Sequence, residues 1–97
     1  MNPVYIARTR EVAARSIGGE MMILSARDSR LFSLNHSATA IWLGADGVTP
    51  LATIVDRVCR EYDVEPAIAL RDARELIDGL AAQGVLHVSD TPFAEAS

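Results

Sequence analysis

The hydrophobic pattern of this chain changes its period once, after Leu34, and this change constrains the fold more than any other feature. Before Leu34, short apolar runs are separated by Gly18-Gly19 and by Arg27-Asp28-Ser29, which is typical of strands joined by tight turns. After Leu34, apolar residues recur at spacings of three and four, which indicates amphipathic helices. The chain is therefore predicted to be an α+β protein, with a three-stranded antiparallel sheet followed by three helices.

The three predicted strands cover residues 12–17, 21–25 and 30–34. Gly18-Gly19 joins the first two, because two consecutive glycines reach positive φ without a steric penalty and so form a tight hairpin turn. Arg27-Asp28-Ser29 forms the next turn. A short extended segment at residues 4–7 is expected to precede this meander.

The first two predicted helices each begin at a capping residue. Asn35 can accept hydrogen bonds from the free amides of the first helix, and Gly47 supplies a left-handed stop. Thr49 caps the second helix, with Pro50 at its first position, where a missing N–H costs nothing. The apolar faces predicted to form the core comprise Ala38, Ile41, Trp42 and Ala45 in the first helix, and Leu51, Ile54, Val55, Val58, Cys59 and Tyr62 in the second.

The third predicted helix begins at Pro66, runs to about Gln83 and ends at Gly84, before a short closing strand or extended tail at residues 85–88. Ile68 and Leu70 lie beside its main apolar face and widen it, which fits either a broad core contact or a groove for a partner. The apolar face comprises Ala69, Ala73, Leu76, Ile77 and Leu80, and the polar face pairs Arg71 with Glu75 and Arg74 with Asp78.

The length and charge of the chain restrict the classes of protein to which it can belong. Residues 1–97 are predicted to form a single domain, with an ordered core at about residues 8–88. The net charge of −4 has the wrong sign for a protein that binds nucleic acid through its phosphates. No segment approaches the roughly 20 apolar residues of a membrane span, and no secretion signal is visible, so we expect no membrane partner and a cytoplasmic protein.

The residues that carry chemistry are few and scattered. Cys59 is the single cysteine, which excludes an internal disulfide and a thiolate metal cage, and its place on an apolar helical face indicates a core residue. His36 and His87 are not tied by spacing to each other or to Cys59. We therefore predict no catalytic residue, no metal and no cofactor, and we expect that the protein is not an enzyme.

Three motifs in the middle of the chain together resemble a known family. They are the string from Leu34 to Trp42, which reads Leu-Asn-His-Ser-Ala-Thr-Ala-Ile-Trp, then Asp46-Gly47, then the Pro-started amphipathic segment at residues 49–55. This combination resembles the PqqD-like family of peptide chaperones, also called RiPP recognition elements. The resemblance covers about residues 8–88 and extends to Gln83-Gly84 near the end of the third helix.

The resemblance implies a winged-helix-like fold that binds the leader segment of a ribosomally made precursor peptide as an added strand. Family members present that peptide to a modifying enzyme, such as a radical-SAM protein, a cyclase or a protease. In the namesake pathway the product is pyrroloquinoline quinone, although many relatives serve other peptides.

A peptide site is expected where an open sheet edge meets the third helix, because an unpaired strand binds a peptide through backbone hydrogen bonds and neighbouring side chains supply specificity. The arginines of the helix would favour an acidic leader. The predicted peptide-binding residues are Arg30, Leu31, Phe32, Ser33, Leu34, Ala69, Arg71, Ala73, Arg74 and Ile77.

Two other functions fit the same architecture. A winged-helix DNA-binding protein would place a helix in the major groove, but Arg71 and Arg74 both have acidic neighbours one turn away, which leaves little positive field for phosphates. A protein-interaction module would use the wide apolar surface to bind another protein or to form a homodimer.

Overall fold

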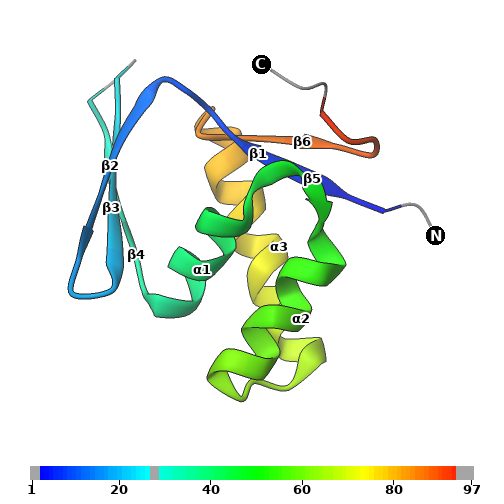
Figure 1. Cartoon of the computed structure of the whole chain (residues 1–97). Coiled ribbons are helices and arrows are strands. Elements are labelled where there is room, and N and C mark those ends of the chain that lie inside the picture. Colours follow the sequence, from blue (N-terminus) through cyan, green and yellow to red (C-terminus); the bar gives the residue numbers. More distant parts are fainter. Residues whose placement is uncertain (1–2, 27–28, 94–97) are drawn as a thin grey trace.

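The computed structural model describes residues 3–26 and 29–93, which form three helices and two small sheets (Figure 1). The α+β class is confirmed, as are the three-stranded antiparallel sheet and the three helices that follow it. In chain order, the elements are β1 (Tyr5–Arg8), β2 (Val12–Ile17), β3 (Glu20–Ser25), β4 (Leu31–Leu34), α1 (His36–Gly44), β5 (Asp46–Pro50), α2 (Leu51–Tyr62), α3 (Pro66–Ala82) and β6 (Leu86–Ser89).

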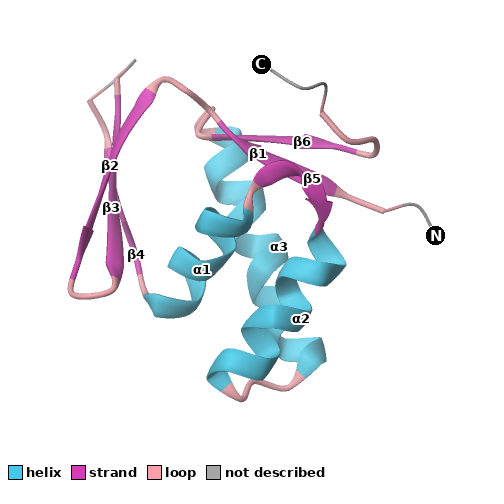
Figure 2. Ribbon diagram, viewed as in Figure 1, coloured by secondary structure: helices cyan, strands magenta, loops and turns pink. Residues whose placement is uncertain are grey.

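The first sheet is an antiparallel meander in the order β2-β3-β4, and it stands to one side of the helices (Figure 2). Gly18 and Gly19 join β2 to β3 with φ values of +61° and +84°, as the hairpin prediction requires. The next turn was predicted at Arg27-Asp28-Ser29, of which Arg27 and Asp28 lie outside the described residues. β3 lies in the centre, so β2 and β4 are both edge strands.

The two faces of this sheet have different environments. Side chains alternate between the faces of a strand, and the β3 side chains that face the helices, Met21, Ile23 and Ser25, are buried. On the opposite face, Leu24 of β3 and Leu31 of β4 are exposed at 44% and 63%. The sheet is thus covered by helices on one face only.

A second sheet, in the order β5-β1-β6, joins the two ends of the chain and was not predicted as a sheet. Its middle strand, β1, pairs antiparallel with β6 from Tyr5 opposite Ser89 to Arg8 opposite Leu86. Ile6 of β1 is fully buried, so the core begins before residue 8.

The segment that forms β5 is the one in which the sequence pattern predicts the end of the first helix and the start of the second. The prediction that Gly47 ends the first helix is wrong, because α1 ends at Gly44 and Gly47, at φ +83°, lies within β5. Thr49 does not cap α2; Pro50 occupies the cap position. The Thr49 amide and hydroxyl instead donate to the Asp46 carboxylate at 2.8 Å each, and the Val48 amide donates to it at 3.0 Å. These bonds, chiefly that from Val48, lower the pKa of Asp46.

The helices enclose a core against both sheets. The Asn35 cap is confirmed, because its side-chain oxygen accepts a hydrogen bond from the Ala38 amide at 2.9 Å. Trp42 of α1 and Ile54 of α2 are each only 2% exposed, and Ala73 of α3 is fully buried. In the described residues, Cys59 is half-buried at the margin of this core.

None of the helices in residues 3–26 and 29–93 is long and apolar enough to cross a membrane.

Thr39 ties α1 to the first sheet through a buried hydroxyl. The Met21 amide donates to Thr39 Oγ1 at 2.9 Å, and Thr39 Oγ1 donates to the Leu34 carbonyl at 3.1 Å. Met21 and Leu34 lie opposite each other on β3 and β4, so the hydroxyl bridges a backbone pair that would otherwise bond directly. It therefore fixes the end of β4 to α1.

We expect Thr39→Val to lower the free energy of unfolding by about 1–3 kcal/mol, because the shape of the side chain is kept while a buried amide and carbonyl lose their partner. Urea titration monitored by Trp42 fluorescence measures the loss. Thr39→Ser keeps the hydroxyl and serves as the control, with a smaller loss expected. A loss for Thr39→Val no larger than that for Thr39→Ser would show that the hydroxyl bridge contributes no more to stability than the methyl group does.

Candidate functional site

The β4 strand presents two residues with outward-facing backbone groups. The Ser25 amide donates to the Arg30 carbonyl at 2.8 Å, and bonded and non-bonded pairs alternate along an antiparallel ladder. In the register that pairs Ile23 with Phe32, Phe32 therefore bonds to β3. Leu31 and Ser33 turn their N–H and C=O groups away from β3, and no described residue bonds to them. They form an open edge.

Two observations place helix α3 near the two ends of β4. At the beginning of β4, Arg30 Nη1 donates to Gln83 Oε1 at 2.9 Å. At the end of β4, a cavity of about 400 Å³ lies between α3 and the first turns of α1, which follows β4 directly. We call the space between β4, α1 and α3 the β4–α3 groove.

The cavity in the β4–α3 groove has an apolar part and a polar part. The apolar part is formed by the buried Ile41 and the half-buried Ala38 of α1 and by the half-buried Leu76 of α3. The polar lining residues are Asn35 and Ser37 from the start of α1, and Asp72 and Glu75 from α3. This arrangement can hold an apolar side chain next to a polar or charged one.

The predicted site residues on β4 fall into two groups. Leu31 and Ser33 are exposed, whereas Phe32 is half-buried and Leu34 is 4% exposed in the core. The exposed pair supplies the outward backbone groups, and the buried pair anchors the strand. Arg30 stands just before β4 and reaches α3 through Gln83.

The predicted site residues on α3 do not line the groove. Ala69, Ala73 and Ile77 are 6%, 0% and 4% exposed, because they form the face that packs into the core. Arg71 and Arg74 are exposed and are not among the residues that line this cavity. The predicted ion pair of Arg71 with Glu75 is replaced by a 3.6 Å contact with Asp72. Ala69, Ala73 and Ile77 therefore lie in the core, and Arg71 meets the groove only through its contact with Asp72.

The sequence does not predict the flank of α3 that borders the groove. Asp72, Leu76 and Gln83 are separated by four and seven residues, so they share one side of the helix. That side is fixed by the Arg30–Gln83 hydrogen bond and by the cavity. Leu76 was recognised in the sequence only as part of the apolar face, since periodicity alone does not say which margin of a face meets a sheet edge.

A cavity of about 400 Å³ also adjoins the other edge strand of this sheet, β2, but its lining residues all belong to the sheet itself, so it has no helical wall. Residues 13–17 are exposed on both faces of the strand. A peptide on this edge would gain backbone hydrogen bonds and contacts with the sheet but none with a helix, so β4 is the better candidate.

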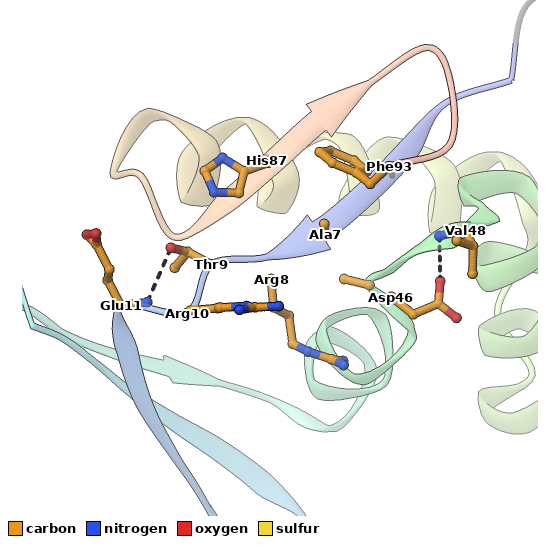
Figure 3. Close-up of a pocket in the computed structure, with 10 residues that line it drawn as sticks. Ala7, Arg8, Thr9, Arg10, Glu11, Asp46, Val48, His87 and Phe93 are labelled. Carbon is orange, nitrogen blue, oxygen red and sulfur yellow. Dashed lines mark hydrogen bonds between the residues drawn. The ribbon is translucent and has the colours of Figure 1, made fainter. Parts of the chain in front are cut away.

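A larger cavity of about 710 Å³ lies on the other side of the molecule, beside β1 and β6 (Figure 3). Both basic and acidic residues line this cavity. The Arg8 guanidinium already donates hydrogen bonds to the Trp42 and Leu43 carbonyls, at 2.9 and 2.7 Å. Phe93 partly covers this sheet, and its amide donates to the Gly47 carbonyl at 2.8 Å. Although the edge strands β5 and β6 contribute to its lining, none of the described residues that line this cavity belongs to a helix, so it lacks a helical wall.

Within the part of the chain that the structure describes, no three His, Cys, Asp or Glu side chains gather as a metal site would require. His36 instead contacts the Gly18 carbonyl at 3.2 Å through Nε2, which ties the β2–β3 hairpin to the start of α1.

Comparison with solved structures finds two related chains. The structure of TbiB1 in complex with the TbiA(beta) leader peptide matches with a TM-score of 0.75 and 25% sequence identity, over 92% of this chain and 99% of that one. The solution structure of the PqqD truncation of Methylobacterium extorquens PqqCD, described as a functional and stand-alone RiPP recognition element, matches with a TM-score of 0.69 and 27% identity, over 84% of this chain and 87% of that one.

Comparison with curated protein sequences finds no match. The family model of coenzyme PQQ synthesis protein D (PqqD), however, matches residues 20–86, which is more than half of the chain. The match spans β3 and β4, all three helices and the start of β6. It thus includes every residue that lines the cavity of the β4–α3 groove. This chain belongs to the PqqD family.

Proposed function

We propose that this protein is a non-catalytic chaperone that binds the leader segment of a ribosomally made precursor peptide and presents it to a separate modifying enzyme. The leader lies along β4 as an added strand. The observation that carries this proposal is the open β4 edge, with the outward N–H and C=O groups of Leu31 and Ser33, and a partly apolar cavity between α1 and α3 just beyond the end of that strand. Such an edge is a hazard for aggregation unless a peptide is meant to pair with it.

The related structures support this assignment. TbiB1 is similar over nearly its whole length and was solved with a leader peptide bound. The Methylobacterium extorquens domain, which has a similar fold, acts as a stand-alone recognition element. A domain of this size can therefore do the binding by itself, and the chemistry then belongs to a partner.

The partner in this proposal is a peptide-modifying enzyme, such as a radical-SAM protein, a cyclase or a protease, in the cytoplasm. Membership of the PqqD family makes the synthesis of pyrroloquinoline quinone one candidate pathway. A homodimer joined through the second open edge, β2, would leave β4 free for the leader, and sedimentation with and without the peptide tests for it.

The test uses the leader of a precursor peptide encoded beside the gene for this chain. Titrating the labelled protein with that leader should shift the amide resonances of residues 31–34 and of the α3 flank at Asp72, Leu76 and Gln83. The Leu31 and Ser33 amides should also become protected from hydrogen exchange, because they gain hydrogen bonds.

Shifts confined to residues 56–62 of α2, with β4 and α3 unaffected, would place the peptide elsewhere and overturn the proposed site. A nonspecific DNA duplex at low salt serves as the control, and no shift is expected from it because the net charge is −4.

A further inference from the structure

We propose that the leader places an apolar side chain and a basic side chain next to each other on the side that faces α3. This inference rests on the proposed function and specifies the chemistry of the peptide. It reverses the charge that the arginines of α3 suggested from the sequence. Three features of the β4–α3 groove lead to it: the spacing of an added strand, the apolar cavity and the charges at its rim.

An added strand presents every second side chain to the same face, about 6.6–6.8 Å apart. On β4, the inward face is the one that carries the half-buried Phe32 and the buried Leu34. Inward side chains of a peptide paired with β4 therefore point toward α1 and α3. One of them meets the apolar surface formed by Ile41 and Leu76.

The next inward position lies near two carboxylates. Asp72 and Glu75 both line the cavity, and their spacing of three residues places them on neighbouring positions of the helix surface. Glu75 forms no ion pair with any described residue. Asp72 has only a 3.6 Å contact with Arg71, and both side chains of that pair are largely exposed, at 60% and 68%, so the contact neutralises Asp72 weakly.

The positive charges of this region do not balance these carboxylates. Arg30 is held by Gln83 at the opposite end of the groove. Neither Arg71 nor Arg74 is among the residues that line the cavity, and Arg74 lies two residues from both Asp72 and Leu76, on a different side of α3. The groove therefore has an excess of negative charge beside an apolar surface, and it favours Lys or Arg two residues from an apolar residue.

The charge of the groove influences which leader peptide binds, because backbone hydrogen bonds do not distinguish one peptide sequence from another. Hydrogen bonds from Leu31 and Ser33 form with a peptide of any sequence, so side chains at the groove must distinguish one peptide from another. A leader with Glu at the inward position would meet two like charges, which disfavours binding without changing the strand pairing.

The experiment selects peptides from a displayed library of random 12-residue sequences on two proteins, the wild type and the Asp72→Lys/Glu75→Lys variant. We expect wild-type selection to enrich peptides with Lys or Arg two positions from an apolar residue, and selection on the variant to enrich Asp or Glu there. A peptide enriched on the wild type should bind the double variant about tenfold more weakly at low salt, a difference that shrinks as salt is added.

The matched control is Asp56→Lys/Glu61→Lys, which makes the same change in net charge on α2, away from β4. This control should bind the enriched peptide as the wild type does. Equal weakening in both double variants would show that only the net charge matters and would overturn the inference.

Two further outcomes separate this inference from the proposed function. Enriched peptides that shift the β4 amides but carry no preferred charge would overturn the basic-residue inference and leave the groove as the binding site. A selection that yields no peptide whose binding depends on β4 would overturn the proposed function itself.

Discussion

Trp42→Ala is expected to lower the free energy of unfolding by about 3–5 kcal/mol, which is the range for removing a large buried aromatic side chain. Trp42 is 2% exposed and lies on the face of α1 that packs into the common core. A loss of this size is a large part of the stability of a small domain. The variant should therefore unfold at a much lower urea concentration, as followed by far-ultraviolet circular dichroism.

Leu43→Ala is the matched control for this substitution. Leu43 is the next residue of the same helix but is 58% exposed, so its truncation should cost less than about 1 kcal/mol. A loss below about 1 kcal/mol for Trp42→Ala as well would mean that α1 does not contribute this face to the core.

Leu31→Pro is expected to weaken peptide binding by at least about tenfold, or 1.4 kcal/mol. The substitution removes an amide that points to the open edge and places a ring where the added strand must approach. The fold should tolerate it, since proline is accepted on edge strands when the lost N–H faces solvent. Fluorescence anisotropy with a labelled leader peptide measures the affinity.

Two neighbouring variants separate the role of the amide from other effects. Leu31→Ala shortens the same side chain but keeps the amide, so most of the affinity should remain. Phe32→Pro removes an amide that bonds to β3, so it should destabilise the fold. If Leu31→Pro bound the peptide as tightly as the wild type, β4 would not be the edge that pairs with it.

The parts of the fold that local chemistry determines could be predicted from the sequence. Gly18-Gly19 forms its hairpin turn because both residues adopt positive φ, and Asn35 caps α1 through its own side chain. The three strands of the meander and the third helix begin close to where the hydrophobic period and Pro66 placed them.

The second sheet and the groove depend on contacts between distant segments, which periodicity does not encode. β5 forms because β1, some 40 residues earlier, pairs with it, and a sequence of Asp, Gly, Thr and Pro resembles a turn between helices when read alone. Ala69, Ala73 and Ile77 were placed in the site because they mark the apolar face of α3. The margin of that face that meets β4 is set by tertiary packing, through Gln83 and Leu76.

The shortness of the β4 edge limits how firmly the backbone alone can hold a peptide. Leu31 and Ser33 each supply one donor and one acceptor, which makes four hydrogen bonds in all. At about 1 kcal/mol net for each bond, these contribute roughly 4 kcal/mol, which corresponds to a dissociation constant no tighter than the millimolar range, because association and ordering of the peptide cost free energy as well. Side chains in the groove must therefore set how long the peptide stays. An enzyme that engages those same side chains would shorten the residence time and so take the peptide from its carrier.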